Sequence, residues 1–437
     1  MSCPKTLNFN IGVLGHVDSG KTSLVKAIST TASTACFDKN PASKERGITL
    51  DLGFSSFQCP LPSHIAEHGY EKLQVTLVDC PGHASLIKTI IGGSQIIDMM
   101  ILVIDVTKGM QTQTAECLVI GEIICTKMVV IINKTDLLPE DKRASAVEKM
   151  IKRLKLTFQK TKFKEIEIIP VSAKPGGPDS TSAPVGLSEL VEAIGRHAYL
   201  PDRAETGPAL FSVDHCFSMR GQGTVLTGTL LQGTIKVGDM LEIPAVGVEK
   251  KVKSIQMFRV GVEKIVQGDR AGVCLTQFDP TLVERGVVCT PGMVPIVAAV
   301  VADINRINFF KGEISSKAKF HISLGHETVL AKVTLFTGQG GGEGEMLDFS
   351  QEFLYQETLD PEKKAATGEK QFALLEFERL VPVVPGCVLI GSRLDADIHT
   401  SMCRLAFHGN MEWQARDKVD FTKNELTETE DLVEQVY

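Results

Sequence analysis

Short apolar runs and longer amphipathic stretches alternate along the chain up to about residue 200. Leu7, Phe9, Ile11 and Val13 occupy alternate positions, as in a strand with one buried face. Four further runs are apolar and bounded by turn or helix signals, which is typical of buried parallel strands: 75–78, 99–104, 128–132 and 166–171. Segments of helical length and spacing lie between the strands at 21–31, 111–125, 141–160 and 187–197. This alternation predicts a doubly wound α/β domain.

The helical spacing ends near residue 208, and short strands separated by Gly-rich turns follow. The strands expected at 211–216, 223–231, 240–243, 248–257 and 270–275 predict a β-barrel. A second all-β stretch has its clearest strands at 317–323, 328–336, 372–377 and 403–407, with insertions at 337–345 and 358–370. We therefore expect an α/β P-loop G domain at 1–203, two antiparallel β-barrels at 204–293 and 294–410, and a tail at 411–437 without regular structure.

Composition and charge exclude several classes of protein. No apolar run approaches the roughly 20 residues that a spanning helix needs, and the N-terminus lacks the apolar core of a secretory signal, so we expect a cytoplasmic protein. The 11 cysteines are scattered without a C-x-x-C pair, which argues against a structural zinc site. The net charge is −7, which argues against coating of nucleic acid by bulk electrostatics. Most of that charge belongs to the acidic tail, and the body is close to neutral.

A phosphate-binding pattern lies between the first predicted strand and the first predicted helix. The string Gly15-His-Val-Asp-Ser-Gly-Lys-Thr22 matches G-x-x-x-x-G-K-[ST]. In such a loop the backbone N–H groups wrap the phosphates, Lys21 places its ammonium against the terminal oxygens, and the Thr22 hydroxyl ligates Mg²⁺. The loop residues that we expect at the nucleotide are Asp18, Ser19, Gly20, Lys21 and Thr22.

Two further segments complete the predicted phosphate and metal site. Asp79-Cys-Pro-Gly82 follows a buried run, so that Asp79 can hold a Mg²⁺ ligand water and Gly82 can donate its N–H to the γ-phosphate. Thr49 lies where a switch segment is expected, and its hydroxyl is a candidate Mg²⁺ ligand only when the γ-phosphate is present. His83 could orient the attacking water, although a loop histidine is more often a surface residue.

A third segment predicts the base. Asn133-Lys-Thr-Asp136 follows a buried strand, and the Asp136 carboxylate can accept from both N1–H and the 2-amino group of guanine. Adenine would leave this carboxylate unpaired, which discriminates strongly, so the nucleotide is GTP rather than ATP. A later Ser-Ala-Lys string is placed to close over the base. The expected base-site residues are Asn133, Lys134, Asp136, Ser172, Ala173 and Lys174.

These motifs together carry a family resemblance. The chain resembles the translational GTPases of the elongation factor Tu class over about residues 6–408, through His-Val-Asp-Ser-Gly-Lys-Thr, Arg-Gly-Ile-Thr, Asp-Cys-Pro-Gly-His and the barrel string Gly221-Gln-Gly-Thr-Val-Leu-Thr-Gly228. The resemblance implies that His83 positions the hydrolytic water. It also implies that Val17 and Ile48 form an apolar gate, which holds the histidine back until the ribosome engages.

Within that class, the strings at 29–35, 45–54, 90–98 and 392–400 resemble the eukaryotic selenocysteine-specific elongation factors. The resemblance implies a monomeric carrier of selenocysteinyl-tRNA without a membrane role, which uses GTP/GDP and Mg²⁺ and delivers the tRNA to the ribosome at UGA codons. It also implies an aminoacyl pocket at Asp214, His215 and Arg270. A selenol is ionised near neutral pH and serine is not, so cationic groups there would favour selenocysteine. The alternative is that Asp214 and His215 are polar strand-end residues and Arg270 is a surface partner of Asp269.

The resemblance stops near residue 409. Members of the family continue into a basic fourth domain, which couples delivery to the selenocysteine insertion element and its binding protein. We therefore expect a truncated or alternatively ended form, in which coupling to that binding protein is in doubt. Two alternatives stay open at this point: a form that sequesters GTP or charged tRNA without delivery, and an initiation factor two gamma-like carrier of initiator tRNA. The absence of a C-x-x-C pair from the sequence argues against the second, because that family usually has a zinc knuckle.

Overall fold

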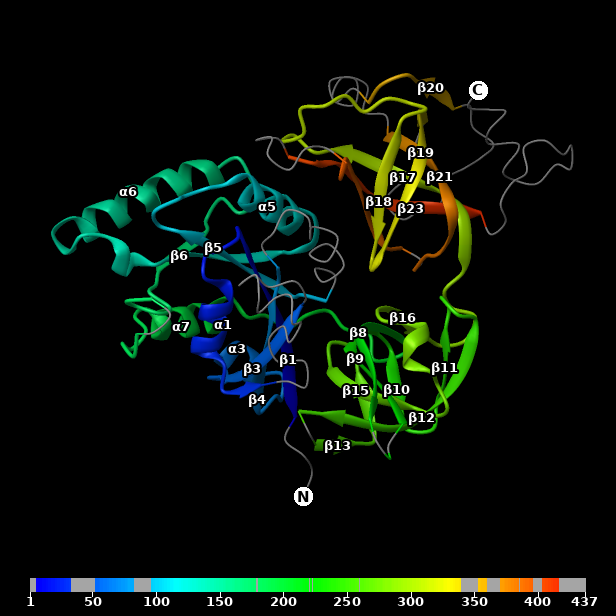
Figure 1. The fold of residues 1–437 in the computed structure, drawn as a ribbon, viewed down its shortest axis with the longest axis horizontal. Coiled ribbons are helices and arrows are strands. Elements are labelled where there is room, and N and C mark those ends of the chain that lie inside the picture. The colour runs from blue at the N-terminus through cyan, green and yellow to red at the C-terminus, as the bar shows by residue number, and fades with distance from the viewer. Residues whose placement is uncertain are drawn as a thin grey trace, which may run out of the picture. The chain divides into compact units, whose positions relative to one another are not determined.

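The computed structural model describes residues 5–32, 52–81, 96–177, 180–219, 221, 223–258, 260–338, 353–359, 370–384, 386–395 and 403–415. The chain forms two compact units (Figure 1). One consists of Met1–Leu241 with Lys250–Val288, and the other of Glu242–Glu249 with Cys289–Tyr437. The predicted fold class, an α/β domain followed by two antiparallel barrels, is confirmed. No helix in the described ranges is both long and apolar enough to cross a membrane.

The α/β domain is built on a seven-stranded sheet in the order β2-β3-β4-β1-β5-β6-β7. Its strands are β1 (Thr6–Gly15), β2 (Thr31–Ala32), β3 (Gly53–Cys59), β4 (Lys72–Asp79), β5 (Met99–Asp105), β6 (Lys127–Asn133) and β7 (Glu167–Pro170). The strands from β4 to β7 in this order run parallel, whereas β3 pairs antiparallel with β4. The helices are α1 (Lys21–Ile28), α3 (Ser63–Ala66), α5 (Thr112–Ile124), α6 (Glu140–Phe158) and α7 (Leu187–His197), with a 3-10 turn η2 (Thr135–Leu137).

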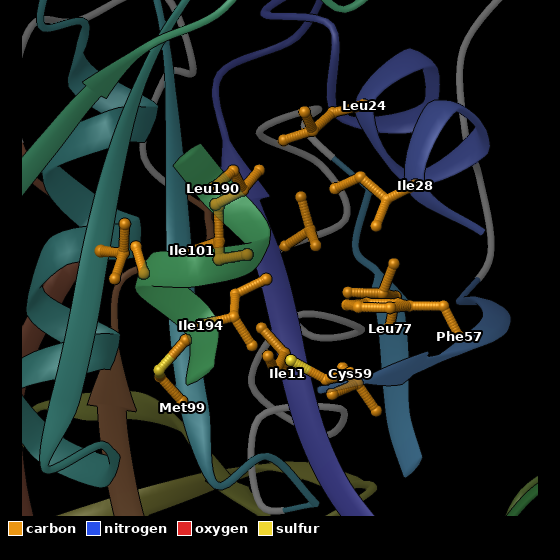
Figure 2. Packing of buried hydrophobic residues seen from close by; sticks show 14 of the residues in the cluster. Ile11, Leu24, Ile28, Phe57, Cys59, Leu77, Met99, Ile101, Leu190 and Ile194 are labelled. Atoms are coloured by element: carbon orange, nitrogen blue, oxygen red, sulfur yellow. The ribbon is translucent and has the colours of Figure 1, made fainter. Parts of the chain in front are cut away.

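The core of the α/β domain fixes the strand that leads into the phosphate loop. The four alternating apolar residues of β1 all lie in one hydrophobic cluster, as the sequence predicted. Helices α1 and α7 cover that face of the sheet, with side chains that include Leu24, Ile28, Leu190 and Ile194 (Figure 2). On the opposite face Gly121 of α5 packs closely against Met100 and Met128. Strand β1 is therefore held between two layers, which is the arrangement that places binding loops at the carboxyl ends of parallel strands.

The first barrel contains all five predicted strands. Six strands close it in the order β11-β16-β8-β9-β15-β12, with β13 added at its edge. The strands are β8 (Leu210–Met219), β9 (Gly223–Gln232), β11 (Met240–Ile243), β12 (Val248–Met257), β13 (Val260–Val262), β15 (Arg270–Leu275) and β16 (Gly286–Cys289). A separate pair, β10 (Thr234–Lys236) and β14 (Lys264–Val266), and a 3-10 turn η3 (Pro280–Leu282) complete it.

The second barrel is also closed by six strands, in the order β18-β22-β23-β17-β21-β19, and β20 pairs with β19. Its strands are β17 (Ile296–Arg306), β18 (Lys319–Leu324), β19 (Glu327–Gly338), β20 (Leu354–Gln356), β21 (Lys370–Pro382), β22 (Val388–Ser392) and β23 (Leu405–Ala415). The rings of Phe320 and Phe407 meet edge to face in its core, with centroids 5.4 Å apart. The first insertion begins later than expected, because Thr337 and Gly338 belong to β19, and most of both insertions lies outside the described residues.

The predicted start of the tail needs a correction. Strand β23 runs past residue 410 to Ala415, and its Trp413 pairs with Val301 of β17 across an irregularity in register. The sequence carries the signal, because Met411, Trp413 and Ala415 alternate with Glu412 and Gln414, a strand period that the charge count obscures. Residues 416–437 lie outside the described part of the chain. The boundaries at 203 and 293 stay predictions.

Candidate functional site

The phosphate loop joins β1 to α1, as the motif predicts. Gly20 precedes the helix with a φ of 90°, a left-handed conformation that side chains rarely adopt, and a Cβ there would collide with the Asn133 amide. Lys21 is only 6% exposed, and its Nζ donates to the carbonyl oxygens of Gly15 at 3.0 Å and His16 at 2.9 Å. Burial lowers the pKa of this ammonium. The loop therefore holds a desolvated cation where phosphate oxygens are expected.

The carboxyl end of β4 brings a carboxylate to the first turn of α1. The Thr22 Oγ1 donates to Asp79 Oδ2 at 2.6 Å, and Asp79 is 1% exposed. A hydroxyl and a buried carboxylate form a hard oxygen donor set of the kind that Mg²⁺ prefers, so these two residues fit the predicted metal site. The predicted Thr49 and Gly82 lie outside the described residues.

Asn133, at the end of β6, links the phosphate loop to the segment that contains Ala173. It ends β6, its Nδ2 donates to the Ser19 carbonyl oxygen at 2.9 Å, and its Oδ1 accepts from the Ala173 N–H at 3.1 Å. The side chain is 2% exposed. Asn133 therefore ties the phosphate loop to the segment that the sequence predicted over the base.

Asp136 is held by that same segment. Its Oδ1 accepts from the Ser172 hydroxyl, and its Oδ2 accepts from the Gly176 N–H at 3.1 Å. The structure thus joins Asp136, through Ser172, to the Ser-Ala-Lys string that the sequence predicted over the base. Lys174 is exposed beside them.

Asp105 is a residue of this site that the sequence analysis missed. It ends β5 next to the end of β6, and its carboxylate accepts from Lys134 Nζ at 2.9 Å and from the Thr107 N–H and hydroxyl. Burial acts to raise the pKa of this carboxyl, but the Thr107 and Lys134 donors outweigh it and hold the pKa below the usual 3.8. The carboxylate therefore fixes the Lys134 side chain. The sequence does contain a signal for this residue, because a carboxylate at the end of an apolar strand is rarely buried without a partner.

The predicted catalytic residues are only partly described. Val17 lies half-buried in the phosphate loop, between His16 and Asp18, and Asp18 has a φ of 59°. Ile48 and His83 lie outside the described residues. Their roles stay predictions from the family resemblance.

The first barrel holds the predicted aminoacyl residues. Arg270 opens β15, and its Nη1 donates to Asp214 Oδ2 at 2.5 Å and to Thr229 Oγ1 at 3.4 Å. Asp214 lies at an irregularity in the β8–β9 register, where a bulge re-aims a side chain, and His215 follows it opposite Thr227. Arg270 and Asp214 are 6% and 1% exposed, so the alternative of a surface pair between Arg270 and Asp269 is wrong.

A residue of the α/β domain reaches the same arginine. The Arg270 guanidinium carbon lies 3.1 Å from the ring centroid of Phe54, the second residue of β3 and itself fully buried. A desolvated guanidinium over an aromatic face is a favourable cation–π arrangement. No local pattern in the sequence indicates this contact, because strand β3 was not predicted and the partner is far away along the chain.

Some polar atoms of this cluster have hydrogen-bonding capacity to spare. Within the described part of the chain, Arg270 Nη2, Thr227 Oγ1 and Asp214 Oδ1 are buried without a hydrogen-bond partner. Buried donors are normally satisfied, so a spare one on a cation can receive an anionic group from a ligand. Arg270 therefore has a donor with which an anionic group of a ligand could pair.

Comparison with known families finds matches along most of the chain. Residues 7–199 match the elongation factor Tu GTP binding domain, and residues 223–290 match elongation factor Tu domain 2. Residues 301–409 match the third domain of eukaryotic selenocysteine-specific elongation factors.

Individual relatives agree with these matches. The selenocysteine-specific elongation factor of Mus musculus is 54% identical over 95% of this chain and 76% of its own length. That of Methanocaldococcus jannaschii is 33% identical over 89% of this chain and 76% of its own length. The crystal structure of elongation factor SelB from Methanococcus maripaludis, in complex with the GTP analogue GppNHp, is 28% identical and superposes with a TM-score of 0.75, covering 95% of this chain and 80% of the other.

Proposed function

Because the chain belongs to the family of selenocysteine-specific elongation factors, which are GTP-hydrolysing translation factors, we propose that it delivers selenocysteinyl-tRNA to the ribosome at UGA codons. The observation that carries the proposal is the buried Arg270–Asp214 pair with its spare Nη2 donor. A selenolate is an anion at neutral pH, whereas the serine hydroxyl is neutral. A guanidinium with an open donor therefore favours selenocysteine over serine.

The contacts around the phosphate loop support the proposed roles of the nucleotide-site residues. Lys21 faces the terminal phosphates, and Asp136 reads the guanine edge while Ser172 and Gly176 hold its carboxylate in place. Asn133 fixes the phosphate loop relative to the segment over the base through its hydrogen bonds to Ser19 and Ala173. The pocket thus favours GTP and GDP over adenine nucleotides.

Thr22 and Asp79 would hold Mg²⁺, with Asp79 acting through a water and Thr49 joining them when the γ-phosphate is present. The ion supplies positive charge against the phosphate oxygens. The short Thr22–Asp79 hydrogen bond, which holds both oxygens at one edge of the sheet, supports this proposal.

Hydrolysis is assigned to His83, which would orient the attacking water, with Val17 and Ile48 as the gate that the ribosome opens. His83→Ala should abolish most of the ribosome-stimulated hydrolysis and leave GTP binding intact, because the histidine acts on the water. The measurement is phosphate release with and without ribosomes. Full stimulated hydrolysis in this variant would remove His83 from the mechanism.

The remaining partners follow from the same family. The second barrel would contact the acceptor and T arms of the tRNA, and the protein would act as a monomer in the cytoplasm. The binding protein of the selenocysteine insertion element is a further candidate partner. The relatives are named for selenocysteine, which favours a carrier of selenocysteinyl-tRNA over a carrier of initiator tRNA.

Delivery is tested by selenocysteine insertion in a lysate depleted of its own factor. Added protein should restore readthrough of a UGA codon in a selenoprotein messenger, and the His83→Ala variant, which binds but does not hydrolyse, should not. Tight binding of GTP and selenocysteinyl-tRNA without any readthrough would instead identify a protein that sequesters its ligands.

A further inference from the structure

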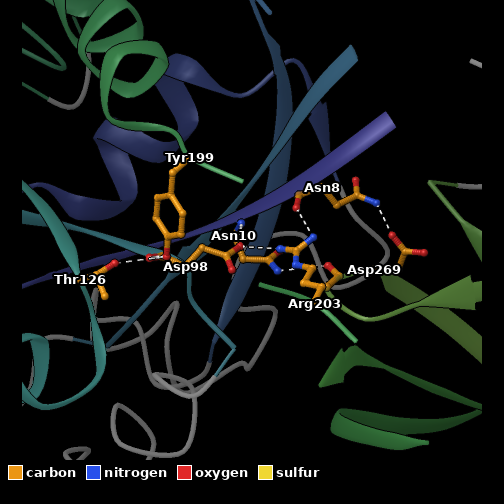
Figure 3. Close-up of polar contacts among 8 residues, drawn as sticks. Asn8, Asn10, Asp98, Thr126, Tyr199, Arg203 and Asp269 are labelled. Carbon is orange, nitrogen blue, oxygen red and sulfur yellow. Dashed lines mark hydrogen bonds and ion pairs between the residues drawn. The ribbon is translucent and has the colours of Figure 1, made fainter. Parts of the chain in front are cut away.

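A second polar cluster lies where the α/β domain meets the first barrel (Figure 3). Its asparagines lie on the side of β1 opposite the apolar residues of the core cluster. Asn8 and Asn10 alternate with the core residues of β1 and are 4% and 2% exposed. Buried amides on a strand need partners, and here the barrel supplies them. Asn8 Nδ2 donates to Asp269 Oδ1 at 2.5 Å, and Asn10 Nδ2 donates to the Gly268 carbonyl oxygen at 3.1 Å.

Arg203, from the chain that connects the two domains, adds a charged clamp to this contact. Its Nη1 donates to the Asn8 carbonyl oxygen at 2.7 Å, and its Nη2 pairs with Asp98 Oδ2 at 2.8 Å. The same Asp98 oxygen accepts from the Asn10 N–H at 2.8 Å. Both ends of the guanidinium are therefore fixed on the α/β domain.

The barrel side of the cluster is a tight turn. Gly268 has a φ of 89°, and a side chain there would occupy the position of the Arg203 guanidinium. Asp269 Oδ2 accepts from the Val266 N–H at 2.9 Å, which closes the turn. The backbone of Gly268 and Asp269 also exchanges hydrogen bonds with Leu230 of β9. The turn is thus held by hydrogen bonds within the barrel. It is also held by hydrogen bonds from Asn8 and Asn10 of the α/β domain.

The residue that follows this turn is Arg270. Its backbone position is set by Asp269 on one side and by the start of β15 on the other, and its guanidinium is then shared between Asp214 and Phe54. We propose that Asn8 and Asp269, with Arg203 as the clamp, are positioning residues for Arg270 and thereby for the choice between selenocysteine and serine. This inference rests on the proposed function for its effect on tRNA choice.

The arrangement also relates the two binding sites. Strand β1 carries Asn8 and Asn10 and ends at Gly15 in the phosphate loop, so one strand supports both the phosphate site and the anchor of the aminoacyl residue. Weakening the contact between Asn8 and Asp269 should therefore change the preference for selenocysteinyl- over seryl-tRNA more than it changes the affinity for GTP. If the contact had only a structural role, its loss would lower the stability of the protein and leave the tRNA preference unchanged.

An exchange of the two side chains tests the proposal. Asn8→Asp places two carboxylates face to face, and adding Asp269→Asn restores one carboxylate and one amide with the roles exchanged. In the double variant the amide oxygen at position 269 can still accept from the Val266 N–H while the amide NH₂ group donates to the carboxylate at position 8. Gln159→Glu, at the exposed end of α6, adds the same charge elsewhere and is the matched control.

Two measurements on the full chain are made for each variant. The first is the ratio of dissociation constants for selenocysteinyl- and seryl-tRNA in the GTP form. Asn8→Asp should lower the preference for selenocysteine about tenfold, because like charges at a contact are strongly unfavourable. The double variant should return to within about twofold of wild type, and the control should not change, since exposed charges have small effects. The second is hydrogen exchange of the β15 amides, which should rise in Asn8→Asp and recover in the double variant.

The outcomes separate this proposal from the proposed function. Faster β15 exchange with an unchanged tRNA ratio, or a double variant that does not recover, would overturn the positioning role. If the wild-type protein itself shows no preference for selenocysteine, the proposed function fails. In that case β15 exchange alone decides whether Asn8 and Asp269 hold Arg270.

Discussion

Asp136→Asn changes the base-reading carboxylate with almost no change in shape. In the structure the two oxygens accept from the Ser172 hydroxyl and the Gly176 N–H, and each retains a second lone pair for guanine. The amide of an asparagine has one oxygen, so its NH₂ group must face one guanine donor in either orientation, together with the Ser172 hydroxyl or the Gly176 N–H. The Ser172 hydroxyl can reverse its role and accept, but the other donors cannot.

The expected loss follows from the hydrogen bonds at stake. A hydrogen bond to a charged acceptor contributes about 1.5–3 kcal/mol, so two of them amount to about 3–6 kcal/mol. At a factor of ten for each 1.4 kcal/mol, GTP affinity should fall by about 10² to 10⁴. Xanthine carries an oxygen where guanine carries the 2-amino group, so the amide should improve binding of xanthosine triphosphate.

The assay is a fluorescence titration of labelled GTP and labelled xanthosine triphosphate against wild type and variant. Ser172→Ala is the matched control. It removes one support of the carboxylate but keeps both oxygens, so it should weaken GTP binding by about tenfold or less and leave the base preference unchanged. An unaltered ratio between the two nucleotides in Asp136→Asn would refute the base-reading role.

Three further predictions concern the neighbouring contacts. Arg270→Met should lower the free energy of unfolding by about 3–5 kcal/mol in urea denaturation because it strands a buried carboxylate, and adding Asp214→Leu should recover most of this. A cost near zero for the single variant would argue against the buried pair. The lowered pKa of Asp105 means that its stabilising pair with Lys134 is complete above pH 3.8 and is lost as the pH falls through the lower folded value. The stability difference between wild type and Asp105→Asn should therefore be constant from about pH 7 to 5 and shrink below about pH 4, and a difference that grows with acid would contradict this sign. Thr22→Ala should reduce GTP affinity in Mg²⁺ but not in EDTA, whereas equal losses in both would separate this hydroxyl from the metal.

Most strands of the fold could be predicted from periodicity, and the exceptions have physical reasons. The predicted ends of β11, β12 and β15 agree with the structure, because Gly and polar turns mark them. Strand β3 escaped prediction because Ser55 and Ser56 interrupt its apolar pattern, yet both are fully buried. The strand gains its stability from pairing with β4, and sequence periodicity does not report that tertiary contribution.

Some residues of the candidate site could likewise be predicted from the sequence, whereas others could not. Lys21, Asp79, Asn133 and Asp136 lie in local motifs at strand ends, where short-range sequence patterns are informative. The contacts of Arg270 with Phe54, and of Asp269 with Asn8, join segments far apart in the chain. Only the fold brings these together, although paired asparagines on the polar side of an otherwise apolar strand are a signal that can be sought in other sequences.

In the proposed mechanism the GTP form selects selenocysteinyl-tRNA through the spare donor of the buried Arg270–Asp214 pair. The most direct test is a competition of selenocysteinyl-, seryl- and initiator tRNA for the GTP form of the full chain. We expect selenocysteinyl-tRNA to displace both others, and Arg270→Met to lose the preference over seryl-tRNA while still binding GTP. Equal binding of selenocysteinyl- and seryl-tRNA by the wild-type protein would contradict selection by this donor.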